Sequence, residues 1–289
     1  KRNKITKKQN KIIEEQKVIV EKKQTEILDS IKYAKRIQEA LLKSEEHESQ
    51  HLPEHFVFFK PKDIVSGDFY WVSEREHYLY VAVADCTGHG VPGGFLSMLG
   101  CSFLNEIVSS EQALKPSEIL DELRNRIVKE LSQTGEIGEN RDGMDISLVR
   151  LDLKSLELQW SGANNPLWVV REKGGLIEKQ IDKDILHENL LEFRPDKMPI
   201  GHHWVMENYT NRTIQLNKGD VFYLFSDGYV DQFGGESGKK FKHKNFKNLL
   251  LRLQDWDMNE RKSHMDQVLN EWMGDYEQID DICVLGLRV

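Results

Sequence analysis

The sequence of 289 residues predicts an α+β fold in which antiparallel strands form layers covered by helices. Short apolar segments are separated by turn signals such as Asn164–Pro166 and Asn217–Asp220, a pattern typical of antiparallel strands. The helical segments occur in pairs and do not alternate with strands, which disfavours a doubly wound parallel sheet. The first segment of the chain contains neither glycine nor proline and predicts one long, separate helix.

The apolar patterns and turn signals also locate the individual elements. We expect strands near residues 55–60, 68–73, 78–85, 145–153, 156–162, 166–171, 208–216, 220–226 and 282–289. We expect helices near residues 92–110, 116–133, 243–254 and 259–273. The section 178–207 shows no regular period, and we interpret it as an irregular surface excursion.

Residues 1–44 are rich in Lys, Glu, Gln and Ile, and apolar residues recur there every seven positions. The repeating positions are Ile13, Val20, Ile27, Ala34 and Leu41. This spacing is typical of a coiled coil, and we expect a homodimer that pairs through it. The seam should be thin, because the second seam position is mostly polar. A solvated single helix is the alternative. The chain then divides into a coiled-coil linker helix, 1–44, and one globular domain, 45–289.

Composition narrows the class of protein. The net charge of −8 disfavours a nucleic-acid binder. Cys86, Cys101 and Cys283 form no CxxC pair, which indicates a reducing compartment without disulfides or a zinc site. No run approaches the roughly 18 apolar residues of a membrane helix, and the sequence begins with a lysine. We therefore expect a cytoplasmic protein, as the cytoplasmic part of a larger sensor protein.

The stretch Tyr78–Gly94, YLYVAVADCTGHGVPGG, is central to the functional argument. Its β-branched and small apolar residues predict a buried strand that ends at Asp85. Burying this carboxylate would be costly without a positive partner. The glycines that follow would let the backbone approach a ligand closely before a helix begins near Pro92.

Other predicted strands begin or end at acids in the same way. Asp68 lies in VSGDFYW, Asp227 lies one residue before the end of VFYLFSDG, and Asp280 and Asp281 precede the last strand. Taken singly, an Asp-Gly pair after a strand is most often a plain turn. Several carboxylates at strand ends, however, form the ligand set that a hard divalent cation needs, and oxygen ligands favour Mg²⁺ or Mn²⁺ over zinc. We therefore predict a centre of two ions that promotes an in-line displacement at phosphorus.

Eight motifs occur in order between Ala34 and Val289. They are AKRIQEALL (34–42), KPKDIVSGDFYWV (60–72), VADCTGHGVPGG (83–94), GMDISLVRLD (143–152), WSGANNPLW (160–168), MPIG (198–201), GDVFYLFSDGYVDQ (219–232) and DDICVLGL (280–287). Their order and spacing resemble the protein phosphatase 2C (PPM) superfamily, in its bacterial SpoIIE-like serine phosphatase branch. The resemblance implies that residues 45–289 form an α/β/β/α sandwich of two antiparallel sheets. It also implies metal ions between the sheets and a phosphoserine or phosphothreonine substrate.

The resemblance assigns roles to individual residues. Asp85 would bridge both metal ions, and the carbonyl of Cys86 would replace the family's usual glycine carbonyl. Asp227 and Asp280 would hold one ion, and Asp68 would act through water. Asp68, Asp85 and Asp227 are therefore the residues expected to carry the catalysis.

Two further acids complete the expected set of metal ligands. Asp281 stands where many relatives have Asn. Asp145, in MDIS, is a candidate ligand for a third ion or a support for a loop, and a solvent-facing acid at a strand start is the alternative.

The sequence departs from the eukaryotic branch of the superfamily at two positions. Thr87 stands where that branch has a His that is proposed as general acid, and His89 follows two residues later, as is usual in the bacterial branch. No Arg matches the residue that grips the phosphate in the eukaryotic branch. Lys60 or Lys62 could serve in its place, and solvated surface lysines are the alternative.

The sequence leaves three functions open. The first is a metal-dependent protein phosphatase regulated through its helix, and proteins of this kind commonly act on a phosphorylated STAS-type anti-anti-sigma factor. The second is a catalytically silent dimeric signalling module that binds a phosphoprotein partner. The third is a metal-dependent hydrolase of small phosphate esters. We prefer the first because every expected acid is present.

Overall fold

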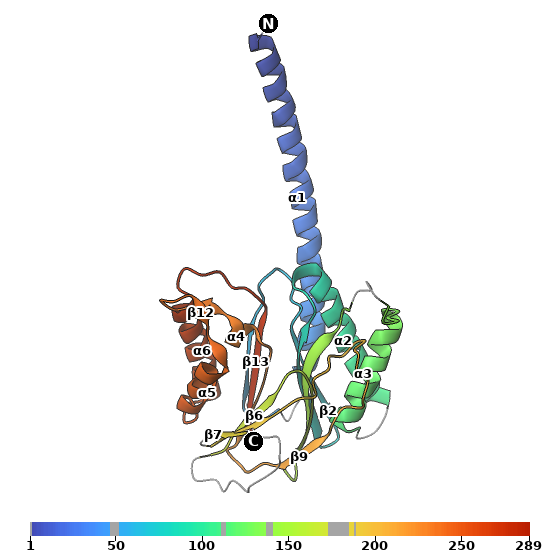
Figure 1. Ribbon diagram of the computed structural model, residues 1–289, viewed down its shortest axis with the longest axis vertical. Coiled ribbons are helices and arrows are strands. Elements are labelled where there is room, and N and C mark those ends of the chain that lie inside the picture. Colours follow the sequence, from blue (N-terminus) through green and yellow to red (C-terminus); the bar gives the residue numbers. More distant parts are fainter. Residues whose placement is uncertain (1, 47–51, 111–113, 137–140, 173–184, 188) are drawn as a thin grey trace.

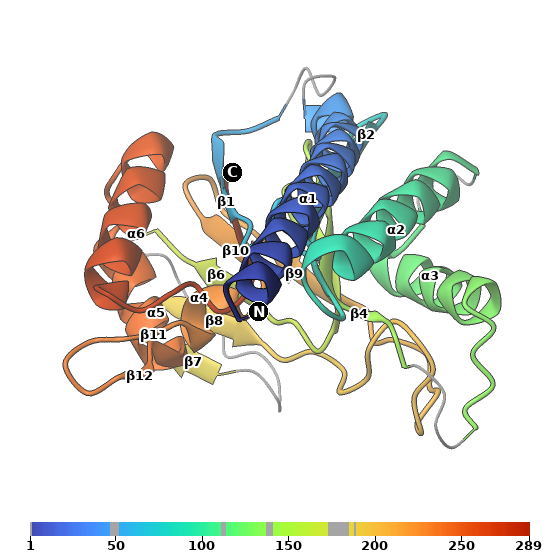
Figure 2. The ribbon, with the colours of Figure 1, turned by 90° about the horizontal axis from the view of Figure 1, so that it is seen from above.

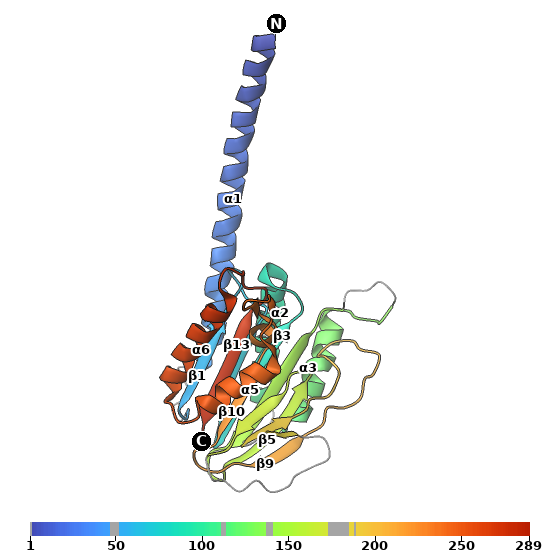
Figure 3. The same cartoon turned by 60° about the vertical axis from the view of Figure 1, so that its left-hand side comes forward.

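The computed structural model describes residues 2–46, 52–110, 114–136, 141–172, 185–187 and 189–289. Over these residues two antiparallel sheets lie face to face, helices cover their outer faces, and α1 (Arg2–Glu46) projects from the domain (Figure 1). The N-terminus lies at the far end of α1, and the C-terminus lies at the opposite end of the domain (Figure 3). This arrangement confirms the predicted α/β/β/α sandwich with an N-terminal helix.

The first sheet has six antiparallel strands in the order β1-β13-β10-β6-β8-β7. They are β1 (His55–Lys60), β6 (Leu167–Val170), β7 (Ile185–His187), β8 (Leu190–Phe193), β10 (Val221–Phe225) and β13 (Ile282–Arg288). Every residue of β10 is buried. Because successive side chains of a strand point to opposite faces, Phe222 and Leu224 pack between the sheets while Tyr223 and Phe225 pack on the other face. The continuous apolar run in the sequence therefore reflects burial on both faces.

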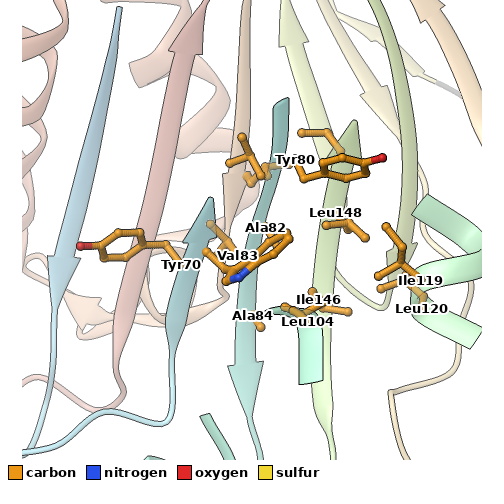
Figure 4. Packing of buried hydrophobic residues seen from close by; sticks show 14 of the residues in the cluster. Tyr70, Tyr80, Ala82, Val83, Ala84, Leu104, Ile119, Leu120, Ile146 and Leu148 are labelled. Carbon is orange, nitrogen blue, oxygen red and sulfur yellow. The ribbon is translucent and has the colours of Figure 1, made fainter. Parts of the chain in front are cut away.

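The second sheet has five antiparallel strands in the order β2-β3-β4-β5-β9. They are β2 (Phe69–Arg75), β3 (Tyr78–Cys86), β4 (Met144–Asp152), β5 (Glu157–Ala163) and β9 (Arg212–Gln215). The close-up of the buried cluster includes Ile146 and Leu148 of β4, together with Leu104, Ile119 and Leu120 from the two helices that cover this sheet (Figure 4).

Helices form the outer layers of the sandwich. The helices α2 (Gly90–Ser110) and α3 (Pro116–Glu130) cover the five-stranded sheet, and α5 (Lys242–Arg252) and α6 (Met258–Met273) cover the six-stranded sheet (Figures 1 and 2). The short helix α4 (Gly228–Asp231) and a hairpin of β11 (Phe233–Gly234) and β12 (Lys239–Lys240) connect β10 to α5. Among the described residues, α2 is the one helix long and apolar enough to cross a membrane, but half of it is buried inside the domain as a core helix.

The section 178–207 is more regular than predicted. It contains β7 and β8, and β8 pairs with β6 in the six-stranded sheet. Strands of three or four residues are too short to give a periodic signal, so their tertiary pairing decides their conformation. The sequence likewise gives no indication of α4 or the β11–β12 hairpin, and the strand expected over 208–216 shortens to β9. The sequence also has a turn signal at Lys173–Gly175, and residues 173–184 lie outside the described part of the chain.

The helix α1 combines an exposed part and a packed part. Ile13, Val20 and Ile27 of the predicted seam are each at least 59% exposed, whereas Gln38 and Leu42 are only 4% and 7% exposed. The C-terminal turns of α1 contact β2 and α2 (Figure 2). The structured domain therefore begins within the helix, a few residues before the boundary expected at 44/45.

Replacing Leu42 tests whether the end of α1 belongs to the domain core. We expect Leu42→Ala to lower the free energy of unfolding by about 2–4 kcal/mol, because it leaves a cavity in a packed cluster. Val18→Ala, at an exposed position outside the seam, should change it by less than about 0.5 kcal/mol. Urea denaturation of both variants measures the difference. Equal stabilities would show that the helix is docked only loosely.

Candidate metal centre

The predicted acids meet at one end of the sandwich, between the two sheets. Asp85 lies in β3 and Asp68 directly precedes β2, so both belong to the five-stranded sheet. Asp227 directly follows the residue after β10, and Asp280 lies just before β13, so both belong to the six-stranded sheet. The charge of Asp280 raises the pKa values of Asp68, Asp85 and Asp227, and the charge of Asp227 raises the pKa values of Asp68 and Asp85, which shows that these carboxylates are neighbours. The structure therefore gathers the expected ligands from both sheets.

Burial and mutual repulsion dominate the electrostatics of this cluster. Burial raises the pKa of Asp68, which is 1% exposed, well above its ordinary value, and neighbouring carboxylates add to the shift. Burial, followed by the charges of Asp68 and Asp227, raises the pKa of Asp85 in the same way. The carboxyl of Asp227 reaches the surface, but the atoms crowded around it and the charges of Asp231 and Asp280 raise its pKa to about 6. A divalent cation would relieve this repulsion, so the cluster suits one.

Ser226 orients the carboxylate of Asp68. Its hydroxyl donates to Asp68 Oδ2 at 2.5 Å and accepts from the backbone N–H of Cys283 at 3.0 Å. The side chain is fully buried, so these bonds fix the Asp68 rotamer in a water-poor environment. Sequence reasoning missed Ser226, although its position immediately before Asp227 is a signal that could have found it.

The carboxylate of Asp281 binds backbone N–H groups of the loop that leads to Asp68. Its Oδ1 accepts from the N–H of Lys62 and its Oδ2 accepts from the N–H of Gly67, both at 2.7 Å. Burial raises its pKa, and these two backbone bonds oppose that shift. Its neighbour Asp280 accepts from the N–H of Asp281 through Oδ1 at 2.9 Å. The carboxylate of Asp281 therefore holds the loop that leads to Asp68.

Asp145 lies at the edge of the cluster. It pairs directly with Asp85 across β3 and β4. Its Oδ1 accepts from Asn164 Nδ2 at 2.8 Å, and its backbone carbonyl accepts from Asn165 Nδ2 at 3.1 Å. Burial raises its pKa, while the Asn164 bond and the charge of Lys197 lower it. These contacts hold the loop after β5 in place. The Oδ2 atom of Asp145 accepts from neither asparagine.

The loop after Asp85 runs very close to the loop before Asp68. A Cβ atom added to Gly67 would lie 2.5 Å from the carbonyl oxygen of Gly88 and 3.3 Å from that of Cys86. A Cβ added to Gly93 would lie 2.1 Å from the oxygen of Gly88, which itself has a φ of +81°. Only glycine allows this approach, and it brings the Cys86 carbonyl to the edge of the acid cluster.

The donor set fits small, hard cations. Among the described residues, no three His, Cys, Asp or Glu side chains converge into one ready group of ligands. The carboxylates are instead spread around the end of the sandwich. This suits ions such as Mg²⁺, which take one or two carboxylates and complete their shell with carbonyls and water. Zinc in a structural site, which prefers a closed tetrahedron of Cys and His, does not fit.

A sandwich of two antiparallel sheets, with buried carboxylates between them and paired helices outside, defines the class of protein phosphatase 2C-type serine/threonine phosphatase domains. The model of the family described as stage II sporulation protein E (SpoIIE) matches residues 75–289. The chain belongs to this family, as its sequence motifs predict. A comparison with curated protein sequences finds no match.

Solved structures support the same assignment. The SiaA-PP2C domain of Pseudomonas aeruginosa is 30% identical, with a TM-score of 0.77 over 92% of this chain and 98% of that chain. The phosphatase domain of SpoIIE from Bacillus subtilis, with a fragment of its regulatory domain, is 16% identical with a TM-score of 0.59, over 81% of this chain and 61% of that chain. RsbX in complex with magnesium is 15% identical with a TM-score of 0.56, over 83% and 98%. The last two comparisons show the fold alone.

The raised pKa values predict how pH acts on the metal-free protein. In the presence of chelator, we expect the free energy of unfolding to fall as the pH rises from about 4 through about 6. The reason is that Asp68, Asp85 and Asp227 keep protons in the folded state that they lose in the unfolded state. Urea denaturation between about pH 4 and pH 7 measures the slope, and saturating Mn²⁺ should reverse it. Asp227→Asn should flatten the chelator curve, and a stability that rises with pH in chelator would contradict the repulsion.

Proposed function

We propose that this chain is a metal-dependent protein serine/threonine phosphatase that uses two Mn²⁺ or Mg²⁺ ions. The observation that carries the proposal is that Asp68, Asp85, Asp227 and Asp280, from both sheets, are electrostatic neighbours at one end of the sandwich in a chain of the SpoIIE family. The magnesium in the RsbX structure supports this choice of ion. The complete acid set disfavours a catalytically silent module.

Each of the predicted ligands has its own expected role in binding the two ions. Asp85 would hold both ions together with the carbonyl of Cys86, and Asp227 and Asp280 would hold one of them. Asp68, oriented by its bond from Ser226, would act through water. When bound, two such ions lower the pKa of water and stabilise the charge that develops in an in-line displacement at phosphorus.

Two of the predicted metal ligands, Asp281 and Asp145, are less suited to bind an ion directly. Both oxygens of Asp281 already accept backbone N–H groups, so we assign this residue chiefly to loop positioning. The Oδ2 of Asp145 would serve a third ion, in competition with the ammonium of Lys197.

The decisive experiment compares substrates and ions. We expect the protein to dephosphorylate a phosphoserine protein in Mn²⁺ or Mg²⁺, and to lose this activity in excess chelator. A chromogenic ester such as 4-nitrophenyl phosphate should be hydrolysed less efficiently, as measured by kcat/KM. Full activity in chelator, or a requirement for zinc, would contradict the proposal. A clear preference for the small ester would favour a hydrolase of small phosphate esters.

Substitution of the acids tests their ranking. We expect Asp85→Asn and Asp227→Asn each to lower kcat/KM by at least about 100-fold, because each removes a direct ligand. Asp145→Asn should cost less, and Asp29→Asn, on the exposed face of α1, should cost nothing. Thermal melting should show that all four variants fold, since removing one acid relieves repulsion in the metal-free form. An active Asp85→Asn enzyme would exclude the bridging role.

Regulation is proposed to pass through α1. Gln38 Nε2 donates to the carbonyl of Ser66 at 2.6 Å and to Ser97 Oγ at 2.8 Å, and Gln38 Oε1 accepts from the N–H of Ser66 at 3.1 Å. Ser66 lies two residues before Asp68. A movement of the helix would therefore reach the metal centre through one loop.

We further propose that the protein is a cytoplasmic homodimer, paired through α1, within a larger sensor. The exposed seam of α1 supports the pairing. For the substrate we propose a phosphorylated protein of the STAS-type anti-anti-sigma class, on the basis of the family resemblance.

Charges placed in the seam test the dimer and its control of activity. The double variant Val20→Lys with Ile27→Lys should be monomeric by light scattering, because lysines in two successive layers would be buried unpaired. Turnover at saturating Mn²⁺ should change with it. The control, Val18→Lys with Thr25→Lys, adds the same charge at the same spacing outside the seam and should remain dimeric. A monomer with unchanged turnover would show that the helix is only a tether.

A further inference from the structure

A chain of three side chains crosses the two loops that meet at the metal centre. Lys62 and Asp63 lie in the loop before Asp68, and His89 lies in the loop after Asp85. The Nδ1 atom of His89 lies 2.6 Å from Asp63 Oδ2, and its Nε2 atom lies 3.1 Å from Lys62 Nζ.

The chemistry of these groups fixes the direction of both bonds. A lysine ammonium can only donate, so Nε2 of His89 must accept from Lys62. The proton of the neutral ring is then on Nδ1, which donates to the carboxylate of Asp63. Asp63 therefore orients the ring, and the ring holds the ammonium of Lys62.

The backbone of Lys62 is fixed as well as its side chain. Its N–H donates to Asp281 Oδ1, and the same carboxylate binds Gly67 through its other oxygen. The backbone of the loop is therefore bound to Asp281, while the ammonium of Lys62 bonds to His89 in the loop after Asp85.

Lys60 and Lys62, the two lysines considered from the sequence, have different surroundings. Lys60 Nζ donates to Asp266 Oδ1 at 3.2 Å and to Asn270 Oδ1 at 2.9 Å, so it is bound to α6. Within the described part of the chain, the ammonium of Lys62 has His89 as its hydrogen-bond partner and no carboxylate. Two of its three N–H donors remain for a ligand, and its charge is not neutralised by an acid.

We propose that Lys62, held by His89 and Asp63, binds the phosphoryl group of the substrate at the rim of the metal centre. A phosphomonoester whose phosphorus lies at the ions presents outer oxygens that need donors, and a positioned ammonium supplies charge-assisted hydrogen bonds to them. The proposal rests on the proposed phosphatase function. Lys62 would touch the substrate, and His89 and Asp63 would be positioning residues.

The first test uses the full chain loaded with Mn²⁺ and inorganic phosphate as the probe. We expect Lys62→Gln to weaken phosphate binding in calorimetry about 10- to 100-fold, the scale of a lost charge-assisted bond. KM for a phosphoserine peptide should rise by a similar factor, with a smaller change in kcat. Lys62→Arg should recover much of the loss, Lys60→Gln should behave as wild type, and Mn²⁺ affinity should be unchanged in all three variants.

The outcomes separate this inference from the proposed function. If wild type hydrolyses the phosphopeptide and Lys62→Gln binds phosphate equally well, the role of Lys62 is wrong and the phosphatase assignment stands. If wild type neither binds phosphate nor hydrolyses the peptide, both fail.

The second test concerns His89. We expect His89→Ala to weaken phosphate binding, and to have no further effect in the Lys62→Gln background, because it acts through Lys62. Melting temperature and Mn²⁺ affinity check that the loop is intact. If His89 were instead the general acid, its loss would slow phenyl phosphate far more than 4-nitrophenyl phosphate, and would do so in the Lys62→Gln background too. That result would overturn the positioning role.

Discussion

The repulsion among carboxylates crowded together at one end of the two sheets is the constraint on which the rest of the structure depends. Asp68 and Asp85 come from one sheet, and Asp227 and Asp280 come from the other. In either sheet alone, the acids would lie at strand ends exposed to solvent. Only the packing of the two sheets against each other brings the four carboxylates together. The large apolar core between the sheets stabilises this arrangement, and so the fold holds in place a site that is unfavourable without cations.

The loops around the cluster are shaped by the same constraint. Backbone groups approach one another closely at Gly67, Gly88 and Gly93, which leaves no space for side chains. Buried acceptors then hold the loops: Asp281 takes two backbone N–H groups, and the hydroxyl of Ser226 links Asp68 to β13. Rigid loops would matter for the proposed metal centre, because the positions of metal ligands must be accurate to a fraction of an ångström.

The sequence predicted those elements whose pattern lies within a few consecutive residues. Strands such as β3 and β10 are continuous apolar runs that end close to an acid, so both the strand and the candidate ligand could be identified. Contacts between distant residues left no local signal. Asp281 binds backbone groups of residues 214 and 219 positions earlier in the chain, so nothing in the sequence indicated that it holds the loop before Asp68.

The same limitation explains the interpretation of Gln38. In the sequence Gln38 occupies the second seam position of the heptad pattern, which is mostly polar and therefore predicted a thin seam. The structure buries it in the phosphatase domain, where its partners lie 28 and 59 residues later. The strand β8 shows a related difficulty, because four residues acquire their conformation from pairing with β6 and not from their own pattern.

The bond between Gln38 and Ser66 has a consequence for the kind of signal that α1 can carry. The amide of Gln38 both donates to and accepts from the backbone of a single residue, so the pair matches in one orientation. A shift of the helix by one residue would rotate the side chain by about 100° and break both bonds at once. Under the regulation through α1 proposed above, this contact would have an engaged and a released position, and a gradual bend of the exposed part of α1 would reach the domain as a stepwise change.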